Sequence, residues 1–433
     1  MVPYKNYFRN KKITVMGLGL LGRGLHDIKF LAECGAKLIV TDLKTKEQLK
    51  SSLLKLKKFK NVAYRLGGHK LEDFRNRDMI IKAAGVPLKS PFITEARKNN
   101  IPVEMSSALF ARLSGIPIIG VTGTRGKSTV THLIYHLLKT AKLKVLLGGN
   151  IKGISTLALL NKVKSGDIAV LELDSWQLQG FGGMKMSPHI AVFTNLLPDH
   201  QNYYENDMDR YFTDKANIFK FQTKKDFTIA GASIAGRIKT KGKKIIPKFL
   251  PSSWLIKLPG KHNRNNAALA IAAVKIFGLN DEIIKKGLRT FNGVPGRLEL
   301  IREVRGIKFY NDTTATTPDA TRIGLMALGK NNKLILIMGG SDKKLNMDSL
   351  LKIIPKYCKK IILLPGTGTD NLPAKFKNNC VSASTMKEAV REAVKISKQG
   401  DIVLLSPAFA SFGLFKNEFD RGEKFNQLVR KLK

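Results

Sequence analysis

The segment 118–129 carries the strongest chemical signal in this chain of 433 residues. It reads Ile-Ile-Gly-Val-Thr-Gly-Thr-Arg-Gly-Lys-Ser-Thr, an apolar β-branched run that leads into a glycine-bearing loop and then into a helical pattern. The backbone amides of such a loop can surround phosphate groups, while Lys127 would add a point charge and the Ser128 hydroxyl would reach Mg²⁺. Val121 occupies the first glycine position of the strict Walker pattern, so the match is imperfect. The segment nevertheless predicts a phosphate-binding loop.

Glu172 and His200 are the next candidates for chemistry. Glu172 ends an otherwise apolar run, and burying its carboxylate without a cation would be costly. His200 follows a second apolar run, and the carboxyl ends of neighbouring parallel strands share one edge of a sheet. This placement favours a metal beside the phosphate-binding loop. Alternatively, the glutamate reaches solvent from a strand end and the histidine is an ordinary loop residue.

A second glycine-rich loop, Gly17-Leu-Gly-Leu-Leu-Gly22, follows an apolar run and opens a helical pattern. Asp42 stands at the end of the next apolar run, which is the geometry of a dinucleotide-binding fold. The loop predicts a nucleotide site without saying which nucleotide. A tight turn that binds nothing is the alternative.

Strand-like runs alternate with helical segments along most of the chain, as in parallel sheets covered by helices. We therefore predict an α/β protein of three domains. These are a Rossmann-like domain at 1–105, a central domain with the parallel sheet of a P-loop ATPase at 106–294, and a second Rossmann-like domain at 295–433. Strands are expected at 13–16, 37–40, 116–119, 168–173, 190–194, 308–310, 334–338, 361–364 and 402–405.

Composition narrows the protein class but does not identify a function. With 43% hydrophobic and 25% charged residues, the chain is typical of a globular protein, and no apolar run is long enough to span a membrane. Its three cysteines have no metal-type or disulfide-type spacing, which indicates a reducing cytoplasm. The net charge of +42 favours an anionic substrate or partner, although a general excess of surface lysine would explain it equally well.

Four segments together resemble the ATP-dependent Mur ligases of peptidoglycan synthesis, in order and in spacing. They are Thr122–Thr129, Asp199-His200, His262-Asn-Arg-Asn-Asn266 and Asn311-Asp312. Within that family, the sequence is most similar to the members that add D-glutamate. This closer similarity rests on Gly17–Gly22, Gly148–Ile151, Glu172–Leu178, Leu405–Ser411, Phe415–Asn417 and Arg421-Gly422.

The resemblance implies transfer of the ATP γ-phosphoryl group to the carboxylate of UDP-N-acetylmuramoyl-L-alanine, followed by attack of D-glutamate on the acyl phosphate. Lys127, Glu172, His200 and Lys215 would be catalytic. Two Mg²⁺ ions would be held by Ser128, Glu172, His200 and Lys215, the last as a carbamate. The implied ATP contacts are Gly123, Thr124, Arg125, Gly126, Lys127, Ser128, Thr129, Asn263, Asn266, Arg297 and Asp312.

The same resemblance implies a set of substrate contacts. Leu20, Leu21 and Asp42 would hold the uridine diphosphate, and Asn150 the muramoyl-alanine part. The D-glutamate contacts would be Thr316, Lys343, Ser411 and Phe415. Some positions depart from the usual pattern. Arg125 replaces an asparagine, Asp174 replaces a serine, Thr314 stands where some members have a lysine, and Glu418-Phe419 inverts a Phe-Glu pair. We expect Arg125 either to contact phosphate or to face solvent, and Asp174 to adjust metal or substrate binding.

Three other functions would account for parts of this sequence. A NAD-dependent oxidoreductase would explain the Gly17–Gly22 loop but would leave the phosphate-binding loop at 118–129, Glu172, His200 and Lys215 unused. A nucleic-acid-binding ATPase would explain the charge, but the chain lacks the interleaved aromatic and basic residues of such proteins. A related ligase that adds a different amino acid is the nearest alternative. We expect a cytoplasmic monomer that binds small molecules and no nucleic acid.

Overall fold

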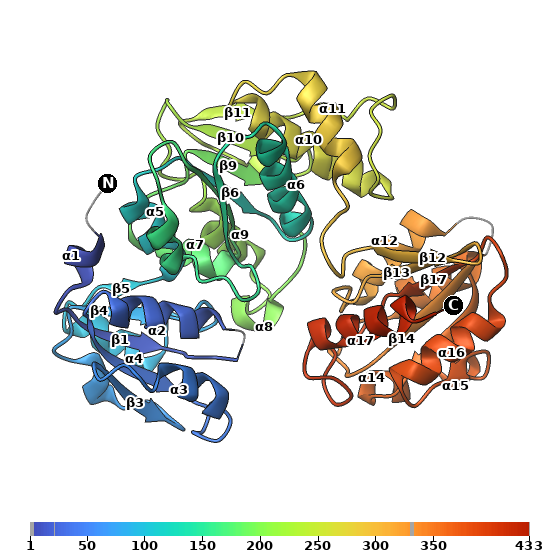
Figure 1. Ribbon diagram of the computed structural model, residues 1–433, viewed down its shortest axis with the longest axis horizontal. Helices are drawn as coiled ribbons and strands as arrows, with labels where there is room; N and C mark the ends of the chain where they lie inside the picture. Colours follow the sequence, from blue (N-terminus) through green and yellow to red (C-terminus); the bar gives the residue numbers. More distant parts are fainter. Residues whose placement is uncertain (1–3, 21, 330–332, 433) are drawn as a thin grey trace. The chain divides into compact units, whose positions relative to one another are not determined.

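The computed structural model describes residues 4–20, 22–329 and 333–432. This part of the chain contains three β-sheets, each covered by helices (Figure 1). The sheets have five, six and six strands and follow one another along the sequence. The predicted α/β fold with three domains is therefore confirmed.

The first sheet is parallel throughout and has the strand order β3-β2-β1-β4-β5. β1 lies at its centre, where the order of connections reverses, and this is where open α/β sheets bind ligands. The strands are β1 (Lys12–Met16), β2 (Lys37–Asp42), β3 (Val62–Leu66), β4 (Met79–Lys82) and β5 (Val103–Glu104). The helices are α1 (Tyr4–Phe8), α2 (Arg23–Glu33), α3 (Lys50–Leu56) and α4 (Pro91–Lys98).

The second sheet is also parallel, in the order β11-β10-β9-β6-β8-β7. Its central strands are buried along their whole length, as expected of strands covered on both faces. The strands are β6 (Ile118–Thr122), β7 (Val145–Gly149), β8 (Ile168–Glu172), β9 (Ile190–Phe193), β10 (Phe227–Ala230) and β11 (Lys243–Ile245). The helices are α5 (Ser106–Ser114), α6 (Lys127–Thr140), the 3-10 helix η2 (Leu157–Lys162), α7 (Ser175–Gly183), α8 (Gln201–Tyr204), α9 (Met208–Ala216), α10 (Lys261–Lys275) and α11 (Asp281–Thr290).

The third sheet has the order β12-β13-β17-β14-β15-β16, and only the pair β12–β13 is antiparallel. The strands are β12 (Glu299–Val304), β13 (Ile307–Asn311), β14 (Leu334–Gly339), β15 (Cys358–Leu364), β16 (Val381–Ser382) and β17 (Ile402–Leu405). The helices are α12 (Pro318–Leu328), α13 (Asp348–Tyr357), α14 (Thr367–Asp370), α15 (Ala374–Lys377), α16 (Met386–Ile396) and α17 (Glu418–Arg430).

Local sequence explains why these helices form. In α16, Met386, Ala389, Val390 and Ala393 are buried and repeat at helical spacing, so one face packs on the sheet. The Thr385 side chain caps its first turn by accepting a hydrogen bond from the Glu388 amide.

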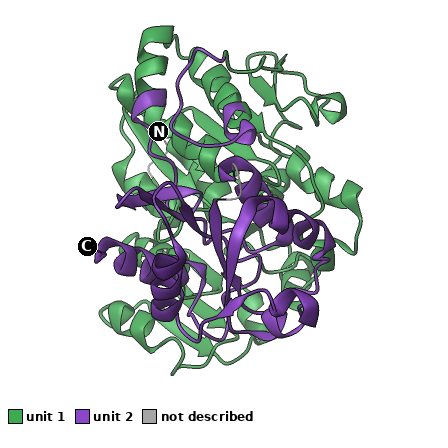
Figure 2. Cartoon of the chain, turned by 90° about the vertical axis from the view of Figure 1, so that its right-hand side faces the viewer, with its two compact units in different colours: residues 1–251, 265–287 green, residues 252–264, 288–433 purple. Residues whose placement is uncertain are grey.

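By contacts, the described chain divides into two compact units, coloured separately in Figure 2. One unit comprises residues 1–251 and 265–287, and the other comprises 252–264 and 288–433. The first two sheets share the first unit, with a continuous hydrophobic core. No helix among the described residues is long and apolar enough to cross a membrane.

Candidate active site

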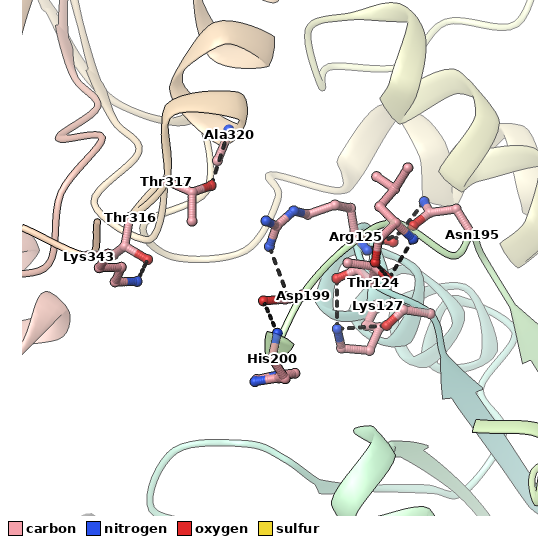
Figure 3. Close-up of polar contacts among 12 residues, drawn as sticks. Thr124, Arg125, Lys127, Asn195, Asp199, His200, Thr316, Thr317, Ala320 and Lys343 are labelled. Atoms are coloured by element: carbon pink, nitrogen blue, oxygen red, sulfur yellow. Dashed lines mark hydrogen bonds and ion pairs between the residues drawn. The ribbon is translucent and has the colours of Figure 1, made fainter. Parts of the chain in front are cut away.

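The predicted phosphate-binding loop lies between β6 and α6, at the carboxyl edge of the second sheet. Gly126 has a φ of 84°, and a Cβ there would overlap the Asn266 side chain, so glycine is required for the close approach of α10. The Lys127 ammonium donates hydrogen bonds of 2.9 Å to the carbonyl oxygens of Gly123 and Thr124 (Figure 3). The amides of Ser128 and Thr129 lie in the first turn of α6, where a helix has no acceptor of its own for them.

Asn195, which the sequence analysis did not single out, holds this loop. Its backbone carbonyl accepts from the Thr124 amide at 2.9 Å, and its Oδ1 accepts from the Arg125 amide at 2.9 Å. These two amides, which we expected to face phosphate, therefore bind the segment after β9 in this structure. Asn195 could have been found from its position in the sequence, two residues beyond the end of a central strand.

Glu172 is the last residue of β8 and only 4% exposed, so the solvent-facing alternative is wrong. Its carboxylate has no ion pair or side-chain hydrogen bond within the described residues. A buried carboxylate without a partner is energetically costly, and a cation relieves that cost. The donor set therefore suits a divalent ion. No group of three or more His, Cys, Asp or Glu side chains in the described chain could hold a metal unaided.

His200 follows β9 in a left-handed backbone conformation, with a φ of 53°. Its imidazole packs against the Trp176 ring in a tilted arrangement, with ring centroids 4.5 Å apart and an angle of 48° between the ring planes. Burial lowers the pKa of His200, which keeps the ring neutral and able to bind a metal. The preceding residue, Asp199, accepts from the His200 amide and forms an ion pair with the Arg125 guanidinium at 3.6 Å (Figure 3). Arg125 therefore joins the phosphate-binding loop to the segment that carries His200.

Lys215 is not a surface lysine, because it lies on α9 with 1% of its area exposed. Its Nζ donates to the Gly123 carbonyl oxygen at 2.9 Å and lies 4.7 Å from the centroid of the Tyr211 ring. Burial, and then the nearby positive charge of Lys127, hold the pKa of Lys215 well below its usual range. The structure thus brings the amine of Lys215 beside the phosphate-binding loop.

Two more expected positions have clear local roles. Asn266, on α10, lies against Gly126. Asn263 is one turn earlier on the same helix, and its Nδ2 donates to the Pro259 carbonyl oxygen at 2.8 Å. Asp174, expected to adjust metal or substrate binding, caps α7 by accepting from the Gln177 amide at 2.7 Å.

The glycine-rich loop of the first domain runs from β1 to α2, as predicted. The Asp42 carboxylate accepts hydrogen bonds from the amides of Gly19 and Lys44, both at 2.9 Å, so it fixes the loop to the end of β2. Leu20 is 63% exposed at the tip of the loop. Leu21 lies outside the described residues.

Asn150 follows β7, and its backbone amide donates to the Glu172 carbonyl oxygen at 2.7 Å. The preceding Gly149 has a φ of 89°, and a Cβ there would overlap the Glu172 backbone. The backbone at Asn150 is therefore held tightly against the strand that carries the buried carboxylate.

In the second unit, Asp312 follows β13 and is 7% exposed. Its two carboxylate oxygens accept from the Leu298 amide at 3.2 Å and from the Ser406 hydroxyl at 2.9 Å. Burial raises the pKa of Asp312 to about 7, against the opposing effects of these hydrogen bonds and of the Arg297 charge. Arg297 is exposed on the turn before β12.

The expected D-glutamate contacts also belong to the second unit. The Lys343 ammonium donates to the Thr316 hydroxyl at 2.8 Å, so this pair is brought together (Figure 3). Ser411 is buried, one residue beyond Ala410, which pairs through its backbone with Ser341. Phe415 is a core residue that packs among apolar side chains of the third sheet. Its ring is also covered by the Lys424 ammonium, 5.2 Å from the ring centroid.

Family models match three parts of the chain. They are "Mur ligase MurD-like, N-terminal domain" at residues 11–104, "Mur ligase middle domain" at 121–250 and "Mur ligase, glutamate ligase domain" at 296–409. The chain is similar over almost its whole length to curated UDP-N-acetylmuramoylalanine–D-glutamate ligases. The enzyme of Borreliella burgdorferi strain B31 is 36% identical, with 98% of each chain covered. The enzyme of Roseiflexus sp. strain RS-1 is 34% identical, with 97% of this chain and 98% of the relative covered.

Solved structures share the fold at lower identity. The UDP-N-acetylmuramate–alanine ligase of Thermotoga maritima superposes with a TM-score of 0.64 at 18% identity, covering 98% of this chain and 100% of the other. The MurF ligase of the same organism, in complex with ADP, gives a TM-score of 0.58 at 17% identity, covering 91% of this chain and 95% of the other.

Proposed function

Because this chain belongs to the Mur ligase family, we propose that it joins D-glutamate to UDP-N-acetylmuramoyl-L-alanine at the expense of ATP, in peptidoglycan synthesis. The observation that carries the proposal is the cluster of Lys127, Glu172, His200 and Lys215 on neighbouring elements at one edge of the second sheet. The cytoplasm, where ATP is abundant, is the proposed compartment.

The proposed reaction has two steps. An oxygen of the L-alanine carboxylate attacks the γ-phosphorus of ATP, which forms an acyl phosphate and releases ADP. The D-glutamate amine then attacks the acyl carbon, phosphate leaves with its bonding electrons, and the amine nitrogen loses a proton. The first step brings two anions together, so positioned positive charge supplies much of the rate enhancement.

Lys127 provides that charge at the phosphate-binding loop, where its ammonium is held by two loop carbonyl oxygens. Ser128 and Glu172 would hold one Mg²⁺ and His200 a second, because these side chains are oxygen and neutral imidazole donors. When bound, the ions would neutralise phosphate charge during transfer. The backbone amides in the first turn of α6 would donate hydrogen bonds to the same phosphates.

Lys215 would act as a carbamate. Its pKa is held well below the usual range, so the amine is available as a neutral nucleophile. The neutral amine nitrogen would add to the carbon of CO₂ and lose a proton, which converts an uncharged amine into an anion. An anion at this buried position would support the second metal ion and would attract the nearby positive charge of Lys127.

The proposed substrate contacts fall into two groups, one in each compact unit. Leu20, Leu21 and Asp42 would hold the uridine diphosphate at the glycine-rich loop, and Asn150 the muramoyl-alanine portion. In the second unit, the pair Thr316–Lys343 would bind D-glutamate carboxylate together with Ser411 and Phe415. The proposed ATP contacts are Gly123, Thr124, Arg125, Gly126, Lys127, Ser128, Thr129, Asn263, Asn266, Arg297 and Asp312.

The test is phosphate release from ATP and Mg²⁺ in the presence of UDP-N-acetylmuramoyl-L-alanine. D-Glutamate is compared with L-glutamate, L-alanine, L-lysine and no amino acid. Release that requires D-glutamate supports the proposal. Release with another amino acid would assign the protein to a related ligase, and no release with any of them would refute the reaction.

A matched pair of variants tests the assignment of the loop. Lys127→Ala should lower kcat about 10²- to 10³-fold, as expected when one positioned positive donor is removed from a transition state. Lys139→Ala removes a lysine from the exposed end of the same helix and should leave kcat unchanged. Equal activity of the two variants would show that Lys127 has no part in the chemistry.

A further inference from the structure

One face of α2 holds the loop that carries Asn150. Arg23, His26 and Asp27 are spaced i, i+3 and i+4, so they lie side by side along the helix. This face belongs to the first domain, and it packs against residues 150–155 of the central domain. Both belong to the same compact unit.

His26 and Asp27 anchor that loop, one through its backbone and the other through a side chain. The ring of His26 hydrogen-bonds the Gly153 carbonyl oxygen at 3.1 Å. The buried Asp27 carboxylate accepts from the hydroxyls of Ser106 and Ser155, both at 2.5 Å. Because Ser106 begins α5 and Ser155 precedes η2, Asp27 joins α2 to two separate segments of the central domain.

The third contact reaches the Asn150 side chain. Arg23 Nη1 donates to Asn150 Oδ1 at 2.6 Å, and no other residue in the described chain hydrogen-bonds this guanidinium. An arginine only donates, so the contact fixes which end of the carboxamide faces it. The amide oxygen is occupied, and the NH₂ group is left to donate to a ligand.

We propose that Arg23 is a positioning residue for the nucleotide-sugar substrate, which orients the Asn150 carboxamide so that its NH₂ group donates to a substrate oxygen. The inference rests on the proposed function, because that function makes Asn150 a substrate contact. Arg23 also begins α2 directly after Gly22, so its charge lies at the end of the glycine-rich loop. A positive charge is unfavourable at the N-terminus of a helix, and the hydrogen bond to Asn150 offsets that cost.

Substrate affinity of the full chain provides the test, because it is measured separately from turnover. Calorimetric titration with UDP-N-acetylmuramoyl-L-alanine should show that Arg23→Ala weakens binding about 10- to 100-fold, the range for loss of a hydrogen bond to a charged group. The KM for this substrate should rise by the same factor, while the KM values for ATP and D-glutamate stay within about twofold. Lys29→Ala removes an exposed charge from the same helix and should match the wild type.

A double-mutant cycle separates positioning from direct contact. If Arg23 acts through Asn150, Arg23→Ala adds nothing in the Asn150→Ala background. If the two effects multiply, Arg23 binds the substrate by itself and the proposal is overturned, as it is if Arg23→Ala equals Lys29→Ala. Arg23→Lys, which keeps the charge but loses the planar fork, should also weaken binding and provides the answer if the alanine variant fails to fold.

The binding data also distinguish this inference from the proposed reaction. A wild-type protein that binds the nucleotide sugar but releases no phosphate with D-glutamate would refute the reaction, and the affinities would still decide the role of Arg23. A wild-type protein that binds no nucleotide sugar would overturn both.

Discussion

Replacing Asp312 by asparagine should remove a large part of the pH dependence of stability in the third domain. Burial raises the pKa of this carboxyl to about 7 from an ordinary value of 3.8. The variant is close to isosteric. Its amide oxygen can accept from the Leu298 amide and its NH₂ group can donate to the Ser406 oxygen, which keeps both contacts without a charge.

The sign follows from proton binding. Between about pH 4 and pH 7, the folded state retains a proton that the unfolded state has lost, so stability falls as the pH rises. The contribution of Asp312 is fully present below pH 3.8 and fully lost above about pH 7. The folded and unfolded pKa values of Asp312 differ by about 3. At about 1.36 kcal/mol for each pKa unit, this difference changes the free energy of unfolding by about 4 kcal/mol.

The assay is native-state hydrogen exchange of the amides in β13 and β17, which measures local opening in the intact chain. Between pH 4 and pH 8, the wild type should lose about 4 kcal/mol more opening free energy than Asp312→Asn, because the contributions of all other groups cancel in the comparison. Asp319→Asn is the control, since this aspartate is exposed in the same domain. If Asp312→Asn lost as much as the wild type, the reasoning about burial would be refuted.

Three further predictions concern other buried features. Incubation with ¹³C-bicarbonate should give a carbamate carbonyl signal by NMR that is absent in Lys215→Arg, and a signal that persists in the variant would contradict carbamylation of this lysine. Gly149→Ala should lower the melting temperature by more than Gly166→Ala. Both positions have a positive φ, but only a Cβ at position 149 would overlap the backbone of another residue, Glu172. Equal melting temperatures of the two variants would exclude this clash. Arg421→Met should lower the free energy of unfolding by about 3 kcal/mol, because the fully buried guanidinium of Arg421 donates hydrogen bonds to Thr313 and to the Phe409 carbonyl oxygen. An unchanged melting temperature would show that these hydrogen bonds make no net contribution to stability.

The sequence predicts the elements whose signals are local. β8 and β9 are nearly continuous apolar runs. The two glycine-rich loops directly follow β1 and β6, which are also mostly apolar. The convergence of Glu172 and the phosphate-binding loop at one sheet edge follows from parallel topology alone. These features need no knowledge of packing between distant segments.

Other features depend on packing that the sequence does not display. β11 reads Lys-Lys-Ile, and its pairing with β10 at the sheet edge is invisible in a lysine-rich stretch. Arg23 and Asn150 are 127 positions apart and meet because α2 packs on the central domain. The antiparallel pairing of β12 likewise depends on a turn at Arg305-Gly306 rather than on strand composition. The predicted domain boundaries stay a prediction.

The topology of the third sheet also constrains how the protein is made. β17 lies between β13 and β14, so the strand of this sheet that the ribosome synthesises last occupies its interior. Until residues 402–405 emerge, β13 and β14 each present an unpaired edge, and such edges associate readily with other chains. The first two sheets, by contrast, are complete once β11 has been translated. Nascent chains should therefore carry two folded sheets and one incomplete sheet for the last third of translation, the period in which a chaperone would be of most use.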